Sequence, residues 1–259
     1  ATLTINASHL YSCFDMWRGI IVQPGGYLTL TDVLIEDAQT AVDVTNHTST
    51  AGKVLDISRS VFNKNYTSVS VANYTQTTAT YPFYIKSTFF TSRDFTFTPT
   101  SWPNYSAISA TCSTTNALAT PYCLQNVPYT TLKAPNAGEG AQIGISLTNV
   151  GATTNPSTTP TYYSIQIGDH TNTSSINVFD NLFYGIWAID ANIKVMQNVF
   201  QNSQYKFLHG TYFGGVGIDH KTEWTEPNTY LLLRAPAPYS TSRKNKFYDC
   251  TYAVRTLNI

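Results

Sequence analysis

The sequence predicts an all-β fold in which successive turns of the chain stack as a parallel β-helix. A cadence recurs along it: two apolar residues one apart, two skipped positions, a small polar residue, one skipped position and a bulky apolar residue. The apolar period of two within each copy is that of strands and differs from the 3.6-residue period of helices. Because such a unit cannot bury its own apolar face, repeated units stack on their neighbours as a solenoid.

Five copies follow the cadence closely, and three are weaker. The close copies are Leu3, Ile5, Ser8, Leu10; Leu55, Ile57, Ser60, Phe62; Phe83, Ile85, Thr88, Phe90; Ile176, Val178, Asn181, Phe183; and Ile193, Val195, Asn198, Phe200. The weaker ones are Leu28, Leu30, Val33, Ile35; Ile143, Ile145, Thr148, Val150; and Ser240, Ser242, Asn245, Phe247. Seven residues after the bulky position, a further apolar residue is expected to begin the next strand, at Trp17, Val42, Val69, Phe97, Phe207 and Val254.

The spacing of the copies predicts the domain organisation. The early copies lie about 27 residues apart, a size suited to one turn built from several short strands. Later copies are spaced unevenly, which predicts inserted loops. We therefore expect a single domain over residues 1–259, with about seven to eight turns and two long insertions at about 98–142 and 203–239.

Composition restricts the partners and the location. Charged residues make up 12% of the chain, about half the usual share of roughly 25%, and 15 Lys and Arg balance 15 Asp and Glu. Without a basic cluster or a net field, a nucleic-acid partner is excluded. No apolar run is long enough for membrane insertion, and the N-terminus lacks a signal-peptide layout, so a mature or excised product is expected.

The first and last repeats lie close to the two ends of the sequence, at Leu3 and Val254, and leave no room for a capping element. Uncapped solenoid ends expose unpaired strand edges and an open core. The expectation is that the rest of a longer polypeptide, or another chain, covers them.

The four cysteines fall into two groups. Cys112 and Cys123 lie in one predicted insertion, close enough in sequence to be the disulfide candidates. Cys13 and Cys250 belong to the first and last turns, so stacking at about 4.8 Å per turn separates them too far for a bond. Those two are expected to be free thiols in or near the core.

One stretch carries a family resemblance. Met16-Trp17-Arg18-Gly19-Ile20, the turn Pro24-Gly25-Gly26, the strand Tyr27-Leu28-Thr29-Leu30 and then Ile35-Glu36-Asp37-Ala38 resemble the opening turns of large right-handed β-helix surface proteins of Bacteroidota. The segment from Ile57 to Asn65 is similar to that family's strand-turn consensus. The resemblance implies a right-handed coil, export by type IX secretion and a secreted or cell-surface, adhesin-like role. It implies no reaction, because the matched residues are core and turn residues.

The densest group of ionisable residues is Asp219, His220, Lys221 and Glu223. It could serve as a sugar or metal site. However, consecutive residues of an extended segment point apart, which favours a solvated loop with its charges facing water. Gly168-Asp169-His170 lacks the neighbours of a polygalacturonase site and is interpreted as a turn.

The small polar residues of the cadence could be taken for a binding row. They are Ser60, Thr88, Asn181, Asn198 and Asn245. Stacked turn residues that hydrogen-bond along the axis explain them better, because every turn supplies one.

Two functions remain open. The favoured one is a non-catalytic structural or adhesive module whose loops, rich in Tyr and Trp, bind a glycan or a cell-surface protein. The module would belong to a longer polypeptide or engage a secretion machinery. The alternative is a polysaccharide lyase or glycoside hydrolase of the β-helix type. No catalytic, cofactor or metal residue is assigned from the sequence.

Overall fold

The computed structural model describes residues 1–12, 16–49, 54–76, 83–92, 143–152, 165–168, 176–203, 205–208, 211–222, 231–233 and 244–257. These described residues contain strands and no helix. The expected insertion at 98–142, the disulfide candidates Cys112 and Cys123, and Cys13 lie outside them.

Most of the strands form three parallel sheets. The first sheet contains β1 (Thr2–Asn6), β4 (Tyr27–Thr31), β8 (Leu55–Ser58), β11 (Phe83–Lys86), β14 (Ile165–Ile167), β17 (Ile193–Val195) and β22 (Leu231–Leu233). The second contains β2 (His9–Leu10), β5 (Leu34–Glu36), β9 (Val61–Asn63), β12 (Phe89–Thr91), β15 (Asn177–Asp180), β18 (Asn198–Gln201) and β23 (Lys246–Tyr248). The third contains β3 (Ile20–Val22), β6 (Thr40–Thr45), β10 (Thr67–Gln76), β13 (Ile143–Ala152), β16 (Tyr184–Ala191), β21 (Val216–Lys221) and β24 (Tyr252–Leu257), and β7 (Thr48–Ser49) pairs with β10.

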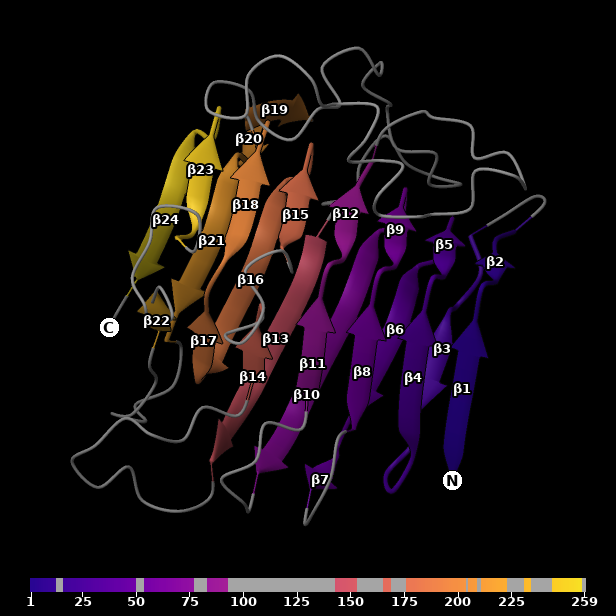
Figure 1. Ribbon diagram of the computed structural model, residues 1–259. Helices are drawn as coiled ribbons and strands as arrows, with labels where there is room; N and C mark the ends of the chain where they lie inside the picture. The colour runs from indigo at the N-terminus through magenta and orange to yellow at the C-terminus, as the bar shows by residue number, and fades with distance from the viewer. Residues whose placement is uncertain are drawn as a thin grey trace.

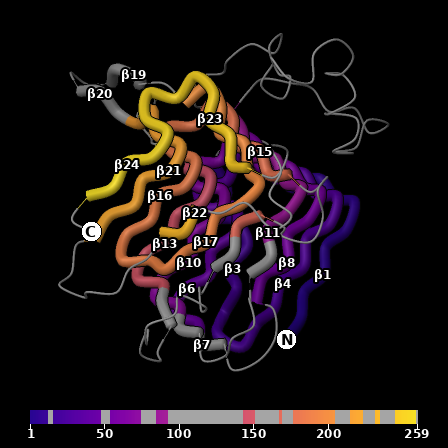
Figure 2. Tube along the Cα trace, turned by 60° about the vertical axis from the view of Figure 1, so that its left-hand side comes forward, coloured from indigo at the N-terminus to yellow at the C-terminus, as the bar shows by residue number. Residues whose placement is uncertain are grey.

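The chain visits the three sheets in a fixed order. A strand of the first sheet is followed by one of the second and then one of the third, and we call each such set of three strands a rung. The antiparallel pair β19 (Tyr205–Leu208) and β20 (Thr211–Gly214) interrupts the sixth rung. The strands of each sheet lie side by side along one direction, with the termini at opposite ends (Figures 1 and 2). This arrangement is consistent with a parallel β-helix.

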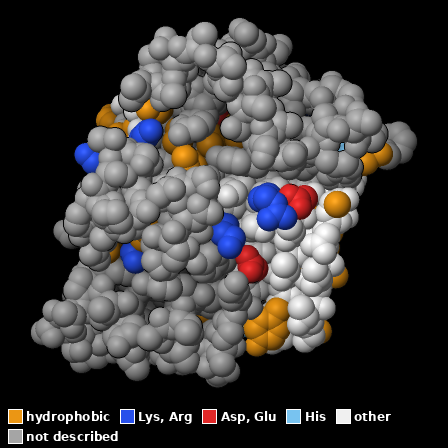
Figure 3. Space-filling model, viewed as in Figure 1, with side chains coloured by type: hydrophobic (Ala, Val, Ile, Leu, Met, Phe, Trp, Pro, Cys, Tyr) orange, Lys and Arg blue, Asp and Glu red, His pale blue; other side chains and the backbone are white. Residues whose placement is uncertain are grey.

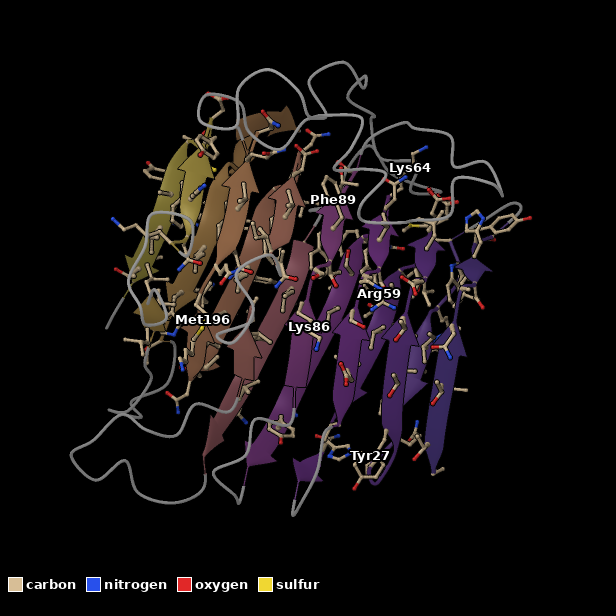
Figure 4. The ribbon with its side chains drawn as sticks, viewed as in Figure 1. Tyr27, Arg59, Lys64, Lys86, Phe89 and Met196 are labelled. Carbon is tan, nitrogen blue, oxygen red and sulfur yellow. The ribbon has the colours of Figure 1, made fainter. Side chains whose placement is uncertain are left out.

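The predicted apolar stack is present on the first sheet. Leu30, Ile57, Ile85, Ile167 and Val195 are in register on successive strands, and each is at most 2% exposed. Val178, expected in the same column, lies instead on the outer face of the second sheet, in a separate buried cluster with Leu34, Val61, Phe89 and Val199. Phe89 marks this face in Figure 4.

The inner face of the second sheet carries a column of phenylalanine rings. They are Phe62, Phe90, Phe179, Phe200 and Phe247, one on each of five successive strands. Their neighbouring centroids are 5.2, 4.8, 4.7 and 4.9 Å apart, with interplanar angles of 12°, 5°, 7° and 9°. Such stacking adds about 0.5–1.5 kcal/mol per pair beyond area burial.

Glycines of the third sheet lie beside this column. A Cβ on Gly144 would lie 2.8 Å from Cδ1 of Phe179, and a Cβ on Gly185 would lie 2.6 Å from Cδ1 of Phe200. A Cβ on Gly217 would lie 2.9 Å from Cδ1 of Phe247. The absence of a side chain therefore lets the backbone approach the ring edges.

Two of the predicted repeat copies are out of register. Residues from Ile143 onward form β13 of the third sheet, and those from Asn177 onward form β15 of the second. The strand equivalent to Ile85 is β14, where Ile167 pairs with Ile85. In the last rung the strand of the first sheet is β22, which precedes the predicted copy, and Ser240 and Ser242 lie outside the described residues. Phe207 lies in the β19–β20 pair, where a strand of the third sheet was expected.

The predicted polar ladder exists with one member exchanged. Asn177, not Asn181, occupies it: Nδ2 of Asn177 donates to Oδ1 of Asn198 at 2.9 Å, and Nδ2 of Asn198 donates to Oδ1 of Asn245 at 3.3 Å. These amides also donate to backbone carbonyls of the preceding rung, such as Ile85 and Ile167. Ser60 and Thr88 hold the equivalent position in earlier rungs. The ladder satisfies buried backbone groups between the first and second sheets.

The outward face of the first sheet is largely uncharged, as composition predicts for the surface. Its described part is mostly white in Figure 3, with basic and acidic side chains beside one another. Arg59, labelled in Figure 4, donates from Nε and Nη2 to the two carboxylate oxygens of Asp32 at 2.8 and 2.7 Å. Both residues have positive φ at the bend that follows their strands.

Candidate functional site

The outward face of the third sheet carries a group of aromatic and charged side chains on β16, β21 and β24. These three strands lie side by side (Figure 2). Trp187, Asp219 and Arg255 are in register on these three strands. Their neighbours Ile186 and Ile218 are fully buried in the core, so the three side chains point outward. Three different side-chain chemistries thus meet on one surface.

Asp219 and Arg255 form a two-bonded ion pair. Arg255 donates from Nε to Oδ1 at 3.0 Å and from Nη2 to Oδ2 at 2.6 Å. The Asp219 side chain is 2% exposed and that of Arg255 is 32% exposed. The bonds to Asp219 raise the pKa of Arg255 above its ordinary value. Both carboxylate oxygens of Asp219 are therefore occupied by a permanent cation.

Two aromatic rings complete the surface. Tyr184 and Trp187 have centroids 6.0 Å apart, with Nζ of Lys221 5.5 Å from the Trp187 ring and Cζ of Arg255 6.0 Å from the Tyr184 ring. Such cation–π contacts are worth about 0.5–1 kcal/mol when exposed. We call Tyr184, Trp187, Asp219, Lys221 and Arg255 the aromatic platform.

From the sequence, functional aromatic residues are expected in loops, and this platform on strands is not predicted. Tyr184 and Trp187 are three apart in a strand, a spacing that places side chains on opposite faces. Here Gly185 and Ile186 both face the interior where the strand begins. Tyr184 and Trp187 are both partly exposed, and the glycine between them is the signal that could have revealed this arrangement.

The predicted ionisable group is not a solvated loop. Asp219 and His220 are 1% and 0% exposed and belong to β21, so the expectation of charges facing water was wrong for them. The expectation that consecutive side chains diverge is confirmed, because Asp219 and Lys221 face outward while His220 faces the core. Glu223 lies outside the described residues.

His220 is held as a neutral ring. Its Nε2 lies 2.8 Å from the carbonyl oxygen of Ala191, which can only accept, so Nε2 carries the hydrogen. Burial lowers the pKa of His220, against smaller opposing effects of the Ala191 bond and of Asp190 and Asp219. The imidazole contributes packing and one hydrogen bond rather than a surface charge.

A second polar group lies on the outer face of the second sheet. Asp180 is fully buried and accepts from Thr91 at 3.0 Å, from Gln201 at 3.0 Å and from Asn202 at 2.7 Å. These donors come from strands on either side of Asp180 or from the residue after one. The carboxylate therefore joins three neighbouring rungs, a structural role.

The other residues considered from the sequence show no convergent site. Gly168 has φ of +102°, and a Cβ there would lie 1.7 Å from the Met196 carbonyl oxygen, so this position requires glycine. Asp169 and His170 lie outside the described residues. Cys250 has a free thiol packed against the core, as expected, and burial raises its pKa.

Two further kinds of site are absent from the described ranges. No three His, Cys, Asp or Glu residues cluster there in a way that could hold a metal ion. The same part of the chain has no helix long and apolar enough to cross a membrane. Comparisons with family models, with curated proteins and with solved structures found no significant match.

Proposed function

We propose that this chain is a right-handed parallel β-helix that acts as a non-catalytic, adhesive module of a secreted or surface-displayed protein, and that its aromatic platform binds a glycan. The observation that carries the proposal is the platform itself: two neighbouring rings, two cations and one carboxylate on the outer face of three paired strands. Sites built on strands hold their side chains more accurately than sites on loops.

The scaffold beneath the platform supports accurate positioning. The three rungs that carry the platform also contain the stacked rings of Phe179, Phe200 and Phe247. Hydrogen bonds of the Asn177–Asn198–Asn245 ladder connect these rungs. Closely packed interiors resist deformation. The Asp219–Arg255 pair fixes the two side chains in one geometry before any ligand arrives, which lowers the entropy lost on binding.

The chemistry of the platform favours a sugar. Aromatic faces pack against the C–H face of a pyranose ring, and the cations beside them can donate hydrogen bonds to hydroxyl groups. One carboxylate and two cations leave one net positive charge, so an acidic glycan should bind more tightly than a neutral one of the same shape.

A glycan array followed by calorimetry on the best ligands tests the proposal. Trp187→Ala is expected to weaken binding at least tenfold, about 1.4 kcal/mol, while leaving the circular dichroism spectrum unchanged. Tyr66→Ala is the matched control, because Tyr66 is an exposed aromatic residue outside the platform. Lys221→Gln should reduce the preference for acidic over neutral ligands.

Two outcomes would reject this function. One is the absence of binding to any neutral or acidic glycan by folded protein, and the other is equal binding by the Trp187→Ala variant. Incubation of the same glycans with the protein also tests the enzymatic alternative, since new reducing ends or unsaturated sugars would identify a hydrolase or lyase.

A further inference from the structure

His220 lies in a core column of the third sheet that aliphatic side chains fill in the preceding rungs. The strands pair in register along this column, and the members before His220 are Val22, Val44, Val71, Leu147 and Ala188. His220 and Ala188 are both 0% exposed. An ionisable ring therefore takes a place where packing alone calls for an apolar side chain.

The hydrogen bonds of the ring leave one nitrogen without a partner. Ala188 is the smallest member of the column and directly precedes His220, and Nε2 donates to the Ala191 carbonyl at the end of β16. Nδ1 then carries the lone pair that can accept a proton. It is buried, and it has no hydrogen-bond partner in the part of the chain that the structure describes.

Charged groups lie near the ring on its own strand and on both neighbouring strands. Asp190 of β16 and Asp219 of β21 favour a proton on His220, but burial opposes it more strongly, so the pKa of His220 is lowered. Arg255 of β24 donates to both carboxylate oxygens of Asp219, and Lys221 follows His220 on β21. The neutral ring is therefore the form that the packed structure accommodates.

The other side of the core supplies no group that could share a charge on the ring. There β17 and β22 contribute Ile193, Val195 and Leu231 to the same hydrophobic cluster. A proton on Nδ1 would be a buried charge without a hydrogen-bonded partner at that nitrogen, which is costly unless the ring reaches water.

Strand β21 connects this ring to the aromatic platform. It lies between β16 and β24 (Figure 2). Asp219 and Lys221 flank His220 and face outward, where Asp219 binds Arg255 and Lys221 lies over the Trp187 ring. If His220 leaves the core to reach water, the backbone between its two neighbours must move, and both platform contacts are lost.

We propose that His220 makes ligand binding at the aromatic platform sensitive to pH: a proton added at Nδ1 draws β21 away from β16, and the platform then releases its glycan. This inference rests on the proposed function, because it concerns the regulation of the same site. In the opened segment His220 titrates near the ordinary histidine pKa of about 6.5, so opening begins to gain below about this pH. Since one proton is taken up per glycan released, the affinity can fall by at most about tenfold per pH unit.

Calorimetry at pH 7.5 and pH 5, with a uronate-containing oligosaccharide selected on the glycan array as the probe, tests the inference. The affinity of the unaltered chain should be at least about fivefold lower at pH 5. His220→Gln keeps a donor for the Ala191 carbonyl but does not titrate, so its affinities at the two pH values should agree within about twofold. Circular dichroism checks that it folds, and His220→Leu, which copies Leu147 of the same column, is the second variant.

His47→Gln is the matched control. His47 is also buried, at 2% exposed, but it follows β6 in an early rung, far along the chain from the platform strands. This variant should keep the full decrease in affinity between pH 7.5 and pH 5.

Hydrogen exchange without any glycan separates this inference from the proposed function. Peptides that span β21 should lose protection at pH 5 relative to pH 7.5, after correction for intrinsic exchange rates, whereas His220→Gln should retain it. If no glycan binds at either pH, the proposed function fails, and the exchange data still decide whether β21 opens. Equal affinity at the two pH values, or unchanged protection of β21 at pH 5, would overturn the inference.

Discussion

Gly185, at the start of β16, allows a sharp test of how the interior is packed. A Cβ there would lie 2.6 Å from Cδ1 of Phe200 and 2.5 Å from the carbonyl oxygen of Gly217. Real Cβ atoms essentially never approach other atoms closer than 3.0 Å. In Gly185→Ala, either the ring column or the neighbouring strand must therefore shift.

Two effects of Gly185→Ala oppose one another. Replacing glycine by alanine at an unstrained position stabilises by about 0.4–1 kcal/mol through the unfolded chain, whereas overpacking a core costs about 1–3 kcal/mol. Ala41 and Ser68 hold the same column position in earlier rungs, so the fold can accommodate a Cβ there. The expected net result is a destabilisation of about 1–2 kcal/mol.

Urea unfolding measures this as a lower midpoint at an unchanged slope. Phe200→Val removes the δ-carbon that the new methyl group meets, so Gly185→Ala should cost less in that background, although the Gly217 contact remains. Gly217→Ala is the matched variant: its ring neighbour Phe247 is only partly buried and can move, so the loss should be smaller. A stabilised Gly185→Ala protein would refute the close packing described here.

Three further predictions follow from the hydrogen bonds and the buried ionisable groups. Asn198→Ala leaves the carbonyls of Ile167 and Met196 and the side-chain amide of Asn177 without their hydrogen-bond partner. Urea unfolding should therefore show a free energy of unfolding lower by at least about 2 kcal/mol, and a decrease below about 0.5 kcal/mol would contradict the ladder. Arg255→Gln should lower the melting temperature more than Asp219→Asn does, because it leaves the carboxylate of Asp219, the less exposed partner, as an unpaired charge. The reverse order of the two melting temperatures would contradict this account. The lowered pKa of His220 means that the unfolded chain binds a proton on this ring more readily than the folded chain does. The contribution of His220 to the free energy of unfolding is therefore complete above about pH 6.5 and declines as the pH falls. His220→Gln should flatten this decline between about pH 7 and 5, and an identical decline in the variant would show that other groups cause it.

Much of the architecture could be predicted because its first rungs follow one rule. The copies that begin at Leu3, Leu28, Leu55 and Phe83 each supply a strand of the first sheet at the expected residues. A small polar residue follows at the first bend in three of these copies, at Ser8, Ser60 and Thr88, and a bulky apolar residue of the second sheet follows in all four. Periodicity was sufficient wherever no residues were inserted between these two strands.

The misplaced copies have a physical cause. Between Ile167 and Asn177 the chain adds residues that separate the first-sheet strand from the second, so the expected spacing is lost. The strand β15 imitates a first-sheet strand because its outer face is also apolar, with Val178 buried beside Phe89. A strand buried on both faces has no alternation that could identify its core side.

The platform was missed for a different reason. Periodicity reports which residues are buried, whereas Trp187 and Arg255 are partly exposed and occupy positions that the core leaves free. Arg255 and Asp219 are far apart in sequence and become neighbours only through pairing of β21 with β24. Without the correct register for β21, no sequence pattern could bring them together.

One column of residues in register on the outward face of the third sheet differs in composition from the buried residues beside it. In chain order its members are Ile21, Asp43, Ser70, Ser146, Trp187, Asp219 and Arg255. The inward neighbours Val42, Val69, Ile145, Ile186 and Ile218 are fully buried and uniformly apolar, because every rung meets the same interior. Outward positions have no such common requirement. The abrupt change from Ser146 to Trp187, with cations and a second ring around it, is the surface feature on which the proposed glycan binding rests.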